Sequence, residues 1–255
     1  MTDSIDRMIL EITKKLNQNV YSIWIYGSVV LNDFQLGWSD IDFIAFTNAT
    51  ITEIQAKQLV MLRQSLSNKF PENPFYHCFE GAILNLQEYL TNNYTKLIYW
   101  GTTGQRITDR YELDVFSRYE LAKYGKSVYG KNNREIFTVP SREELISAIQ
   151  NHYDTIRKYA VQTNESIYSC GWLLDIARCI YTLRYGDIIG KTQAGIWALN
   201  EHIFLDEESL RKTLKIRQQP IRYKYRDDIK LWLSNLGATV QQYADVLETE
   251  LNHNR

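Results

Sequence analysis

The sequence has few of the residues that mark metal-binding or disulfide-rich proteins. Its 255 residues include three cysteines and four histidines. Cys78, Cys170 and Cys179 are odd in number and lack the paired spacing of zinc ligands, so we expect reduced thiols in the core of a cytoplasmic protein. No two histidines have the local spacing of a metal-binding pair, which excludes a histidine motif for a metal centre.

The chain also lacks a surplus of charge and a long apolar run. Lys plus Arg number 29 against 30 for Asp plus Glu, so no strong positive field is available to hold nucleic acid. The N-terminal residues are polar and acidic, unlike a signal peptide, and no apolar run approaches the length of a membrane span. We therefore expect neither a nucleic-acid nor a membrane partner. We also expect a monomer or a weak dimer.

The most informative stretch runs from Gly27 to Asp42, where Gly-Ser is followed after eleven residues by Asp-Ile-Asp. Residues 20–26 and 41–46 are rich in β-branched and aromatic side chains, which favours two strands. Alternation along the second strand places Asp40 and Asp42 on one face. Two carboxylates on one face repel each other unless a cation lies between them, and Mg²⁺ accepts such oxygen ligands. The pattern predicts that Asp40 and Asp42 bind Mg²⁺.

Gly27 and Ser28 supply the complementary half of this stretch. Glycine permits close approach of the backbone to a ligand, and serine favours the start of a helix. A strand that ends in Gly-Ser before a short helix places backbone N–H groups and a hydroxyl where phosphate oxygens could bind. Together the two halves indicate metal-assisted chemistry on a nucleoside triphosphate. The alternative, a capped helix followed by solvated aspartates, would suffice for either half alone.

Hydrophobic periodicity outlines the remaining elements. It predicts helices over 4–16, 53–70 and 113–129, a strand over 74–84, and a strand and turn over 97–104. Beyond a capping box formed by Ser141 and Glu144, the pattern is helical over 141–160, 165–185, 190–202, 206–217 and 225–252. The sequence therefore predicts an α+β fold, with a mixed-sheet domain over residues 1–138 and a helical bundle over 139–255.

The Gly-Ser-x₁₁-Asp-x-Asp pattern resembles the signature of the DNA polymerase β-like nucleotidyltransferase superfamily. More narrowly, the chain is similar to the streptomycin/spectinomycin adenylyltransferases, which modify antibiotics. That family has an arginine on a helix and a lysine thirteen residues later, in a segment ending in Trp-Ala-Leu. Arg178, Lys191 and Trp197 stand at these positions. The resemblance implies an N-terminal nucleotidyltransferase domain, ATP as co-substrate, Mg²⁺ as cofactor and an active site in the cleft between two domains.

The resemblance also implies roles for individual residues. The family carries a catalytic glutamate at a similar interval after the Asp-x-Asp pair, and Glu80 in the 74–84 strand is the candidate general base. The implied set has Asp40, Asp42 and Glu80 in catalysis, Gly27, Ser28, Arg178 and Lys191 in ATP binding, and Trp100 and Glu165 in acceptor binding. A structural alternative pairs Arg178 with Asp175 and leaves Lys191 in a solvated loop.

The acceptor is predicted from the segment that precedes the arginine-bearing helix. In the family, acidic residues precede the arginine-bearing helix, whereas residues 164–169 offer only Glu165, and Tyr168 stands where an acid would be expected. An aminoglycoside or aminocyclitol hydroxyl, as in streptomycin or spectinomycin, is the first candidate. The alternatives are a protein or RNA acceptor, as in toxin–antitoxin members of the superfamily, and a non-catalytic nucleotide sensor.

A basic segment lies near the C-terminal end. Seven cationic side chains fall between Arg211 and Arg226, with acids directly before and after them. Interleaved tyrosines would suit a nucleic-acid surface. The flanking acids instead favour a solvated helix face.

Overall fold

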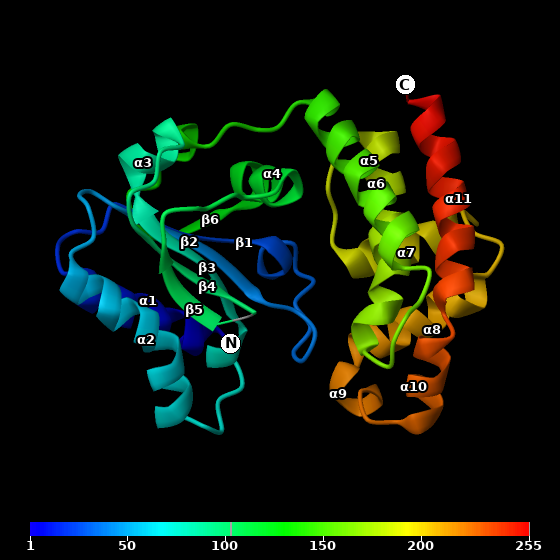
Figure 1. The fold of residues 1–255 in the computed structure, drawn as a ribbon, viewed down its shortest axis with the longest axis horizontal. Coiled ribbons are helices and arrows are strands. Elements are labelled where there is room, and N and C mark those ends of the chain that lie inside the picture. The colour runs from blue at the N-terminus through cyan, green and yellow to red at the C-terminus, as the bar shows by residue number, and fades with distance from the viewer. Residues whose placement is uncertain (103, 255) are drawn as a thin grey trace. The chain divides into compact units, whose positions relative to one another are not determined.

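The computed structural model describes residues 1–102 and 104–254, which form two compact units (Figure 1). Unit 1 consists of Met1–Val30 and Ser39–Val139, and unit 2 consists of Leu31–Trp38 and the chain from Pro140 onwards. Residues 31–38 therefore belong to the helical unit, although the sequence pattern places them in the first domain. We describe each unit by itself.

Unit 1 is built on a six-stranded mixed sheet, which confirms the predicted α+β fold. Its strand order is β5-β4-β3-β2-β1-β6, with β2 and β3 parallel and the other neighbours antiparallel. The strands are β1 (Ser22–Tyr26), β2 (Ile41–Thr47), β3 (Phe79–Asn85), β4 (Leu97–Gly101), β5 (Gly104–Thr108) and β6 (Lys126–Gly130). The central strands are almost wholly buried, as their β-branched and aromatic composition requires.

Helices cover both faces of this sheet (Figure 1). On one side lie α1 (Thr2–Leu16) and α2 (Glu53–Lys69), and on the other α3 (Leu86–Thr91) and α4 (Val115–Tyr124). A capping box at Thr52 and Gln55 starts α2. The α4 side holds a core of Trp24, Ile44, Phe46 and other apolar side chains. Since side chains alternate along a strand, the even-numbered residues of β2 and β3 face α4.

The segment predicted as one helix over 113–129 is a helix followed by a strand. Helix α4 ends at Tyr124, and the N–H of the following Gly125 donates to the carbonyls of Glu120 and Leu121. Strand β6 then pairs with β1 at the sheet edge. The unpaired edge of β1 outweighs the helical periodicity of the sequence here. The strand predicted over 97–104 is present as β4, but the turn includes Thr103, which lies outside the described residues.

Unit 2 is helical and centres on α6. Its helices are α5 (Arg142–Tyr159), α6 (Gly171–Tyr185), α7 (Lys191–Asn200), α8 (Glu207–Gln218), α9 (Pro220–Tyr223), α10 (Asp227–Ser234) and α11 (Gly237–His253). Short 3₁₀ turns occur at Gly27–Val29, Tyr76–Cys78, Arg134–Ile136 and Ile167–Cys170 along the chain. Within the described residues, no helix combines the length and apolarity needed to cross a bilayer.

The predicted final helix over 225–252 is two helices, α10 and α11. The chain turns at Leu236, whose N–H donates to the Thr163 hydroxyl at 3.1 Å. A side chain at Gly237 would lie 2.0 Å from the Val161 carbonyl oxygen, so the turn packs directly against another part of the unit. Hydrophobic periodicity depends only on residues that are near one another in the sequence, so it does not predict such long-range contacts.

Candidate active site

The sheet register brings the predicted carboxylates together. Asp42 on β2 pairs with Glu80 on β3, and with Tyr26 at the end of β1 on its other side. Asp40 stands directly before β2. Ile41 is fully buried between the two aspartates, as strand alternation predicts. The adjacent pair Asp40 and Asp42 thus meets Glu80, which is distant in sequence, at one end of the sheet.

Burial and mutual repulsion make this cluster unfavourable without a cation. Burial, followed by the nearby Glu80 carboxylate, raises the pKa of Asp40 from 3.8 to about 6. Burial likewise raises the pKa of Asp42, with Glu120 the next largest cause and Asp40 after it. Glu120 is an α4 side chain that is only 6% exposed. The sequence reasoning missed it, although an acid inside the apolar run of residues 119–122 was a usable signal.

These residues fit a Mg²⁺ ion that shares its ligands with a substrate. Mg²⁺ is commonly bound by one or two carboxylates, with the remaining positions filled by water and phosphate oxygens. Asp40 and Asp42 would supply two such oxygens. Among the described residues, no group of three or more His, Cys, Asp or Glu side chains is arranged to hold a metal. The described residues therefore do not form a complete metal-binding site from protein ligands alone.

Gly27 and Ser28 lie against the aspartates. Gly27 has a φ of +68°, and a Cβ there would stand 2.1 Å from Oδ2 of Asp42, so a larger residue would displace the carboxylate. The Ser28 hydroxyl donates to the Asp40 carbonyl at 3.2 Å. Ser28 lies inside the 3₁₀ turn, whose N-cap is Tyr26, so the expectation that serine caps a helix is wrong. The serine instead joins the two halves of the motif.

Two side chains not found from the sequence surround Glu80. The Tyr99 hydroxyl donates to Oε1 of Glu80 at 3.2 Å. The Arg63 guanidinium on α2 donates to the carbonyls of Phe79 at 2.6 Å and Gly101 at 2.9 Å. These contacts fix the ends of β3 and β4 beside the carboxylate.

We expect Tyr99→Phe to lower kcat by about 2- to 10-fold, because one hydrogen bond that orients Glu80 is lost. The phenyl ring keeps the packing, so the melting temperature should change little. Steady-state assays of AMP transfer measure the effect, with Tyr129→Phe at an exposed position of β6 as the matched control. An unchanged kcat would show that the Tyr99 bond does not orient Glu80 during turnover.

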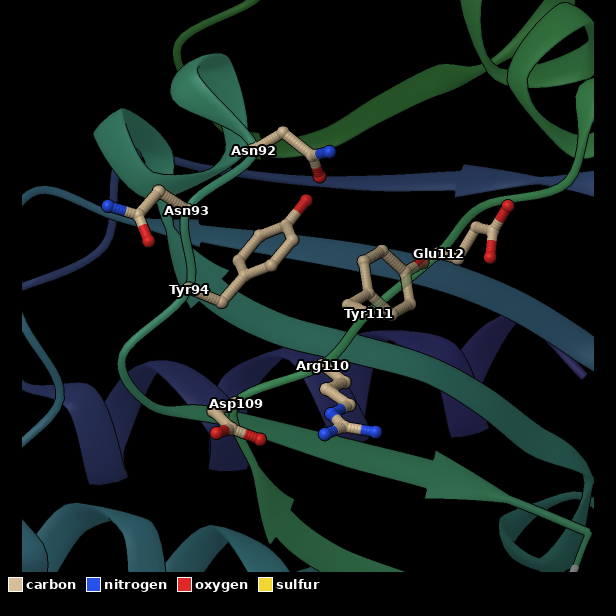
Figure 2. A pocket seen from close by; sticks show the side chains of 7 residues that line it. All are labelled: Asn92, Asn93, Tyr94, Asp109, Arg110, Tyr111 and Glu112. Atoms are coloured by element: carbon tan, nitrogen blue, oxygen red, sulfur yellow. The ribbon is translucent and has the colours of Figure 1, made fainter.

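A polar hollow lies nearby in unit 1 (Figure 2). Its volume is about 400 Å³, and its lining is Asn92, Asn93, Tyr94, Asp109, Arg110, Tyr111 and Glu112. Figure 2 shows the Tyr94 and Tyr111 rings beside each other, and the Tyr111 ring also lies 6.4 Å from that of Tyr99. The hollow thus adjoins the ring that holds Glu80. Its polar lining suits a molecule with hydroxyl or amino groups.

Arg178 and Lys191 lie together in unit 2. Lys191 Nζ stands 2.8 Å from Oδ1 of Asp175, and the Arg178 guanidinium 3.7 Å from the same oxygen. Burial opposes ionisation of Asp175, but Lys191 and Arg178 outweigh it and lower its pKa. Asp175 thus contacts both cations through one carboxylate oxygen. The structural alternative, in which Arg178 pairs with Asp175, is therefore present. Lys191, the first residue of α7, contacts the same aspartate.

The two predicted acceptor residues differ in their surroundings. Trp100 is fully buried, its Nε1 donates to the Leu59 carbonyl at 3.1 Å, and its ring packs on Phe43. The prediction that Trp100 lines a substrate pocket is therefore wrong, because the ring is part of the core between the sheet and α2. Glu165 is exposed in the loop before the Ile167–Cys170 turn, where a ligand could reach it.

The basic segment is only partly a solvated face. Arg211 pairs with Glu207 at 2.8 Å, and Arg226 pairs with Asp228 at 2.7 Å, as acids flanking the segment suggested. Arg217 is the exception, because it is 2% exposed. The prediction of a wholly solvated face is wrong at this residue.

The comparisons with known proteins agree with the two-part organisation. Residues 6–80 match the family model of a nucleotidyltransferase domain. Residues 135–236 match the model described as aminoglycoside adenylyltransferase, C-terminal domain. A comparison with curated proteins gave no match.

Solved structures show which fold the chain shares. Spectinomycin adenyltransferase AAD(9) from Enterococcus faecialis, determined with ATP and spectinomycin, matches with a TM-score of 0.66 and 19% identity, over 97% of this chain and 99% of that chain. A toxin–antitoxin structure with AMP-PNP matches with a TM-score of 0.30 and 15% identity, over 60% of this chain and 92% of that chain. Only the first similarity is strong enough to establish a shared fold.

Proposed function

We propose that this chain is a member of the aminoglycoside adenylyltransferase family and that it moves AMP from ATP to a hydroxyl of a small aminocyclitol or aminoglycoside. The observation that carries the proposal is the pairing of Asp42 with Glu80 across two parallel strands. A metal-binding carboxylate next to a candidate base is the arrangement that nucleotidyl transfer requires. A non-catalytic sensor would have no use for the third carboxylate.

Each residue of the cluster has a role in this reaction. Asp40 and Asp42 would hold Mg²⁺, which when bound lowers the repulsion between triphosphate and carboxylates. The Ser28 hydroxyl and the backbone N–H groups beside it would bind phosphate oxygens. Glu80 would accept the proton of the acceptor hydroxyl, while the hydroxyl oxygen forms a bond to the α-phosphorus. The bond from that phosphorus to the bridging oxygen breaks, and pyrophosphate leaves with the electron pair.

Arg178 and Lys191 are proposed to bind phosphate oxygens of ATP. Their shared contact with Asp175 holds both side chains in place before ATP binds. An arginine presents a planar set of donors to phosphate oxygens, while a lysine supplies a compact charge. Asp175 would orient these cations without cancelling both charges.

The acceptor site is proposed from charge and polarity. Aminocyclitols carry amino groups, so their pocket should present carboxylates, carbonyls and aromatic faces. Glu165 and the polar hollow beside Tyr111 provide such groups. The AAD(9) structure holds spectinomycin, so spectinomycin is the first acceptor to test, followed by streptomycin.

Mass spectrometry of a reaction with ATP, Mg²⁺ and a panel of aminocyclitol, aminoglycoside and lincosamide drugs tests the proposal. We expect one drug to gain a single AMP, and Glu80→Gln to slow its formation by about 10²- to 10⁴-fold, because the base is lost. Glu72→Gln, which changes an exposed acid of the same unit, is the control. No adduct on any drug, despite Mg²⁺-dependent ATP binding, would refute a drug acceptor.

A further inference from the structure

Residues 31–38 connect the two halves of the signature, yet they pack in the helical unit. The chain leaves unit 1 after Val30 and returns at Ser39, so the segment begins three residues after Ser28 and ends two residues before Asp40. The segment therefore lies between Ser28 and Asp40 in the chain, while it belongs to unit 2.

The segment is held by a buried ion pair. Asp33 and Arg217 are each 2% exposed, and Nη2 of Arg217 lies 2.7 Å from Oδ2 of Asp33. The same nitrogen donates to the Asp33 backbone carbonyl at 3.2 Å. The guanidinium also lies over the ring of Trp38, 5.4 Å from its centre, so it contacts both ends of the segment.

The pair also determines the start of α7. The N-cap residue Gly190 offers no side chain to satisfy the first N–H groups of the helix. Oδ2 of Asp33 accepts from the Thr192 N–H at 3.1 Å, and Arg217 Nε donates to the Thr192 hydroxyl at 3.1 Å. A Cβ at Gly190 would stand 2.7 Å from Cβ of Asp33, so the glycine leaves room for this cap. Asp33 thus caps a helix that begins 158 residues further along, the separation of Asp33 and Lys191.

The ion pair between Asp33 and Arg217 is not the arrangement that would best stabilise a protein core. Asp33 Oδ1 has no hydrogen-bond partner in the described part of the chain, although it is buried. Buried ion pairs are weak contributors to stability compared with apolar residues of similar size, and an unsatisfied oxygen weakens them further. A role in positioning the start of α7 would explain a charge pair at this place, because directional bonds fix geometry better than apolar contacts do.

We propose that Asp33 and Arg217 are positioning residues for ATP binding, which orient Lys191 through the start of α7 and hold residues 31–38 within the same unit. The inference rests on the proposed function for the role of Lys191. It does not make either residue a contact of the substrate. It assigns them the geometry at the start of α7, where Lys191 directly precedes Thr192.

A double-mutant cycle on ATP affinity tests this inference. Calorimetry with Mg²⁺ and ATP would compare the native protein with Asp33→Asn, Lys191→Met and the double variant. We expect Asp33→Asn to weaken ATP binding by about tenfold or more, because charged hydrogen bonds at the start of α7 are lost. In the Lys191→Met background the same change should have a much smaller effect. Full additivity, or unchanged affinity in Asp33→Asn, would overturn the proposal.

Conservative and distant variants separate positioning from a merely structural role. Arg217→Lys keeps the charge and should retain more ATP affinity than Arg217→Met. Arg157→Met removes an ion pair with Asp245 between α5 and α11 of the same unit, and should leave ATP affinity unchanged even if it lowers the melting temperature. Equal losses of affinity in Arg157→Met and Arg217→Met would contradict positioning.

Hydrogen exchange gives a readout that does not depend on the proposed reaction. In Asp33→Asn, we expect faster exchange in residues 31–38 and at the Thr192 amide, and no change in β2. If the native protein binds no ATP, the proposed function fails while the exchange result still tests the contact itself. Unchanged exchange at Thr192 would show that Asp33 does not hold the start of α7.

Discussion

Asp42→Asn is expected to abolish AMP transfer while making the metal-free protein more stable. An amide cannot replace the charged oxygen that a Mg²⁺ ion requires, so activity should fall on the order of 10⁴-fold or more. The melting temperature in EDTA should rise, because the buried Asp42 carboxylate faces Glu120 and Asp40 without a cation. The opposite signs distinguish a functional loss from unfolding.

The pH dependence follows from the raised pKa values. A carboxyl with a raised pKa in the folded state holds its proton more tightly than the unfolded chain does, so it lowers stability as pH rises through the interval between the two values. For Asp40 this interval runs from 3.8 to about 6. Without metal, we therefore expect stability to decline as pH rises across that range. Asp42→Asn should make the decline smaller, because it removes one of the titrating groups.

Thermal melts in EDTA at pH 4 and pH 6 measure the decline in stability, and melts at pH 8 with EDTA or with Mg²⁺ and ATP measure the effect of the ligand. Mg²⁺ with ATP should stabilise the native protein and have little effect on Asp42→Asn, since ligand binding to the folded state alone raises stability. Asp6→Asn, an exposed change on α1, serves as the control. A lower melting temperature of Asp42→Asn in EDTA would contradict the idea that the carboxylates repel one another in the absence of metal.

The motif strands were predictable because their signals are local. Alternation along residues 41–46 requires no knowledge of the rest of the chain, and it correctly placed Ile41 in the core between Asp40 and Asp42. Glu80 could be suggested only through the resemblance, because its position beside Asp42 depends on the parallel register of two strands. Tyr99 was missed for the same reason, since it comes from another strand, whereas Glu120 had a local signal as an acid within the apolar run of residues 119–122.

Arg217 shows where sequence reasoning reached its limit. It lies among cations that do face solvent, and its partner Asp33 is 184 residues away, so no local pattern distinguishes it. Trp100 is the opposite case, a core residue that was predicted to bind the substrate. The sequence around a tryptophan in an apolar run does not distinguish a core position from a ligand pocket. Edge pairing of β6 likewise depended on β1 rather than on the periodicity of residues 113–129.

Gly81→Ala should destabilise the protein by about 3–5 kcal/mol, through backbone strain together with a steric overlap. Gly81 has a φ of +154°, and a Cβ there would stand 1.8 Å from the carbonyl oxygen of Phe43. This close approach is what allows β3 to lie against β2 with Glu80 beside Asp42. The variant should therefore lose activity as well, because separating the strands moves Glu80 away.

Gly104→Ala isolates the strain from the overlap. Gly104 has a φ of +117°, but no atom lies within 4 Å of the position of its Cβ. We expect this control to lose only about 1–2 kcal/mol, so the difference between the two variants in urea unfolding measures the contact with Phe43. Equal losses would show that the approach of β2 and β3 at Gly81 relaxes readily. The geometry of the carboxylate cluster would then have to depend on Arg63 and Tyr99, which hold β3 and β4 together, rather than on the glycine.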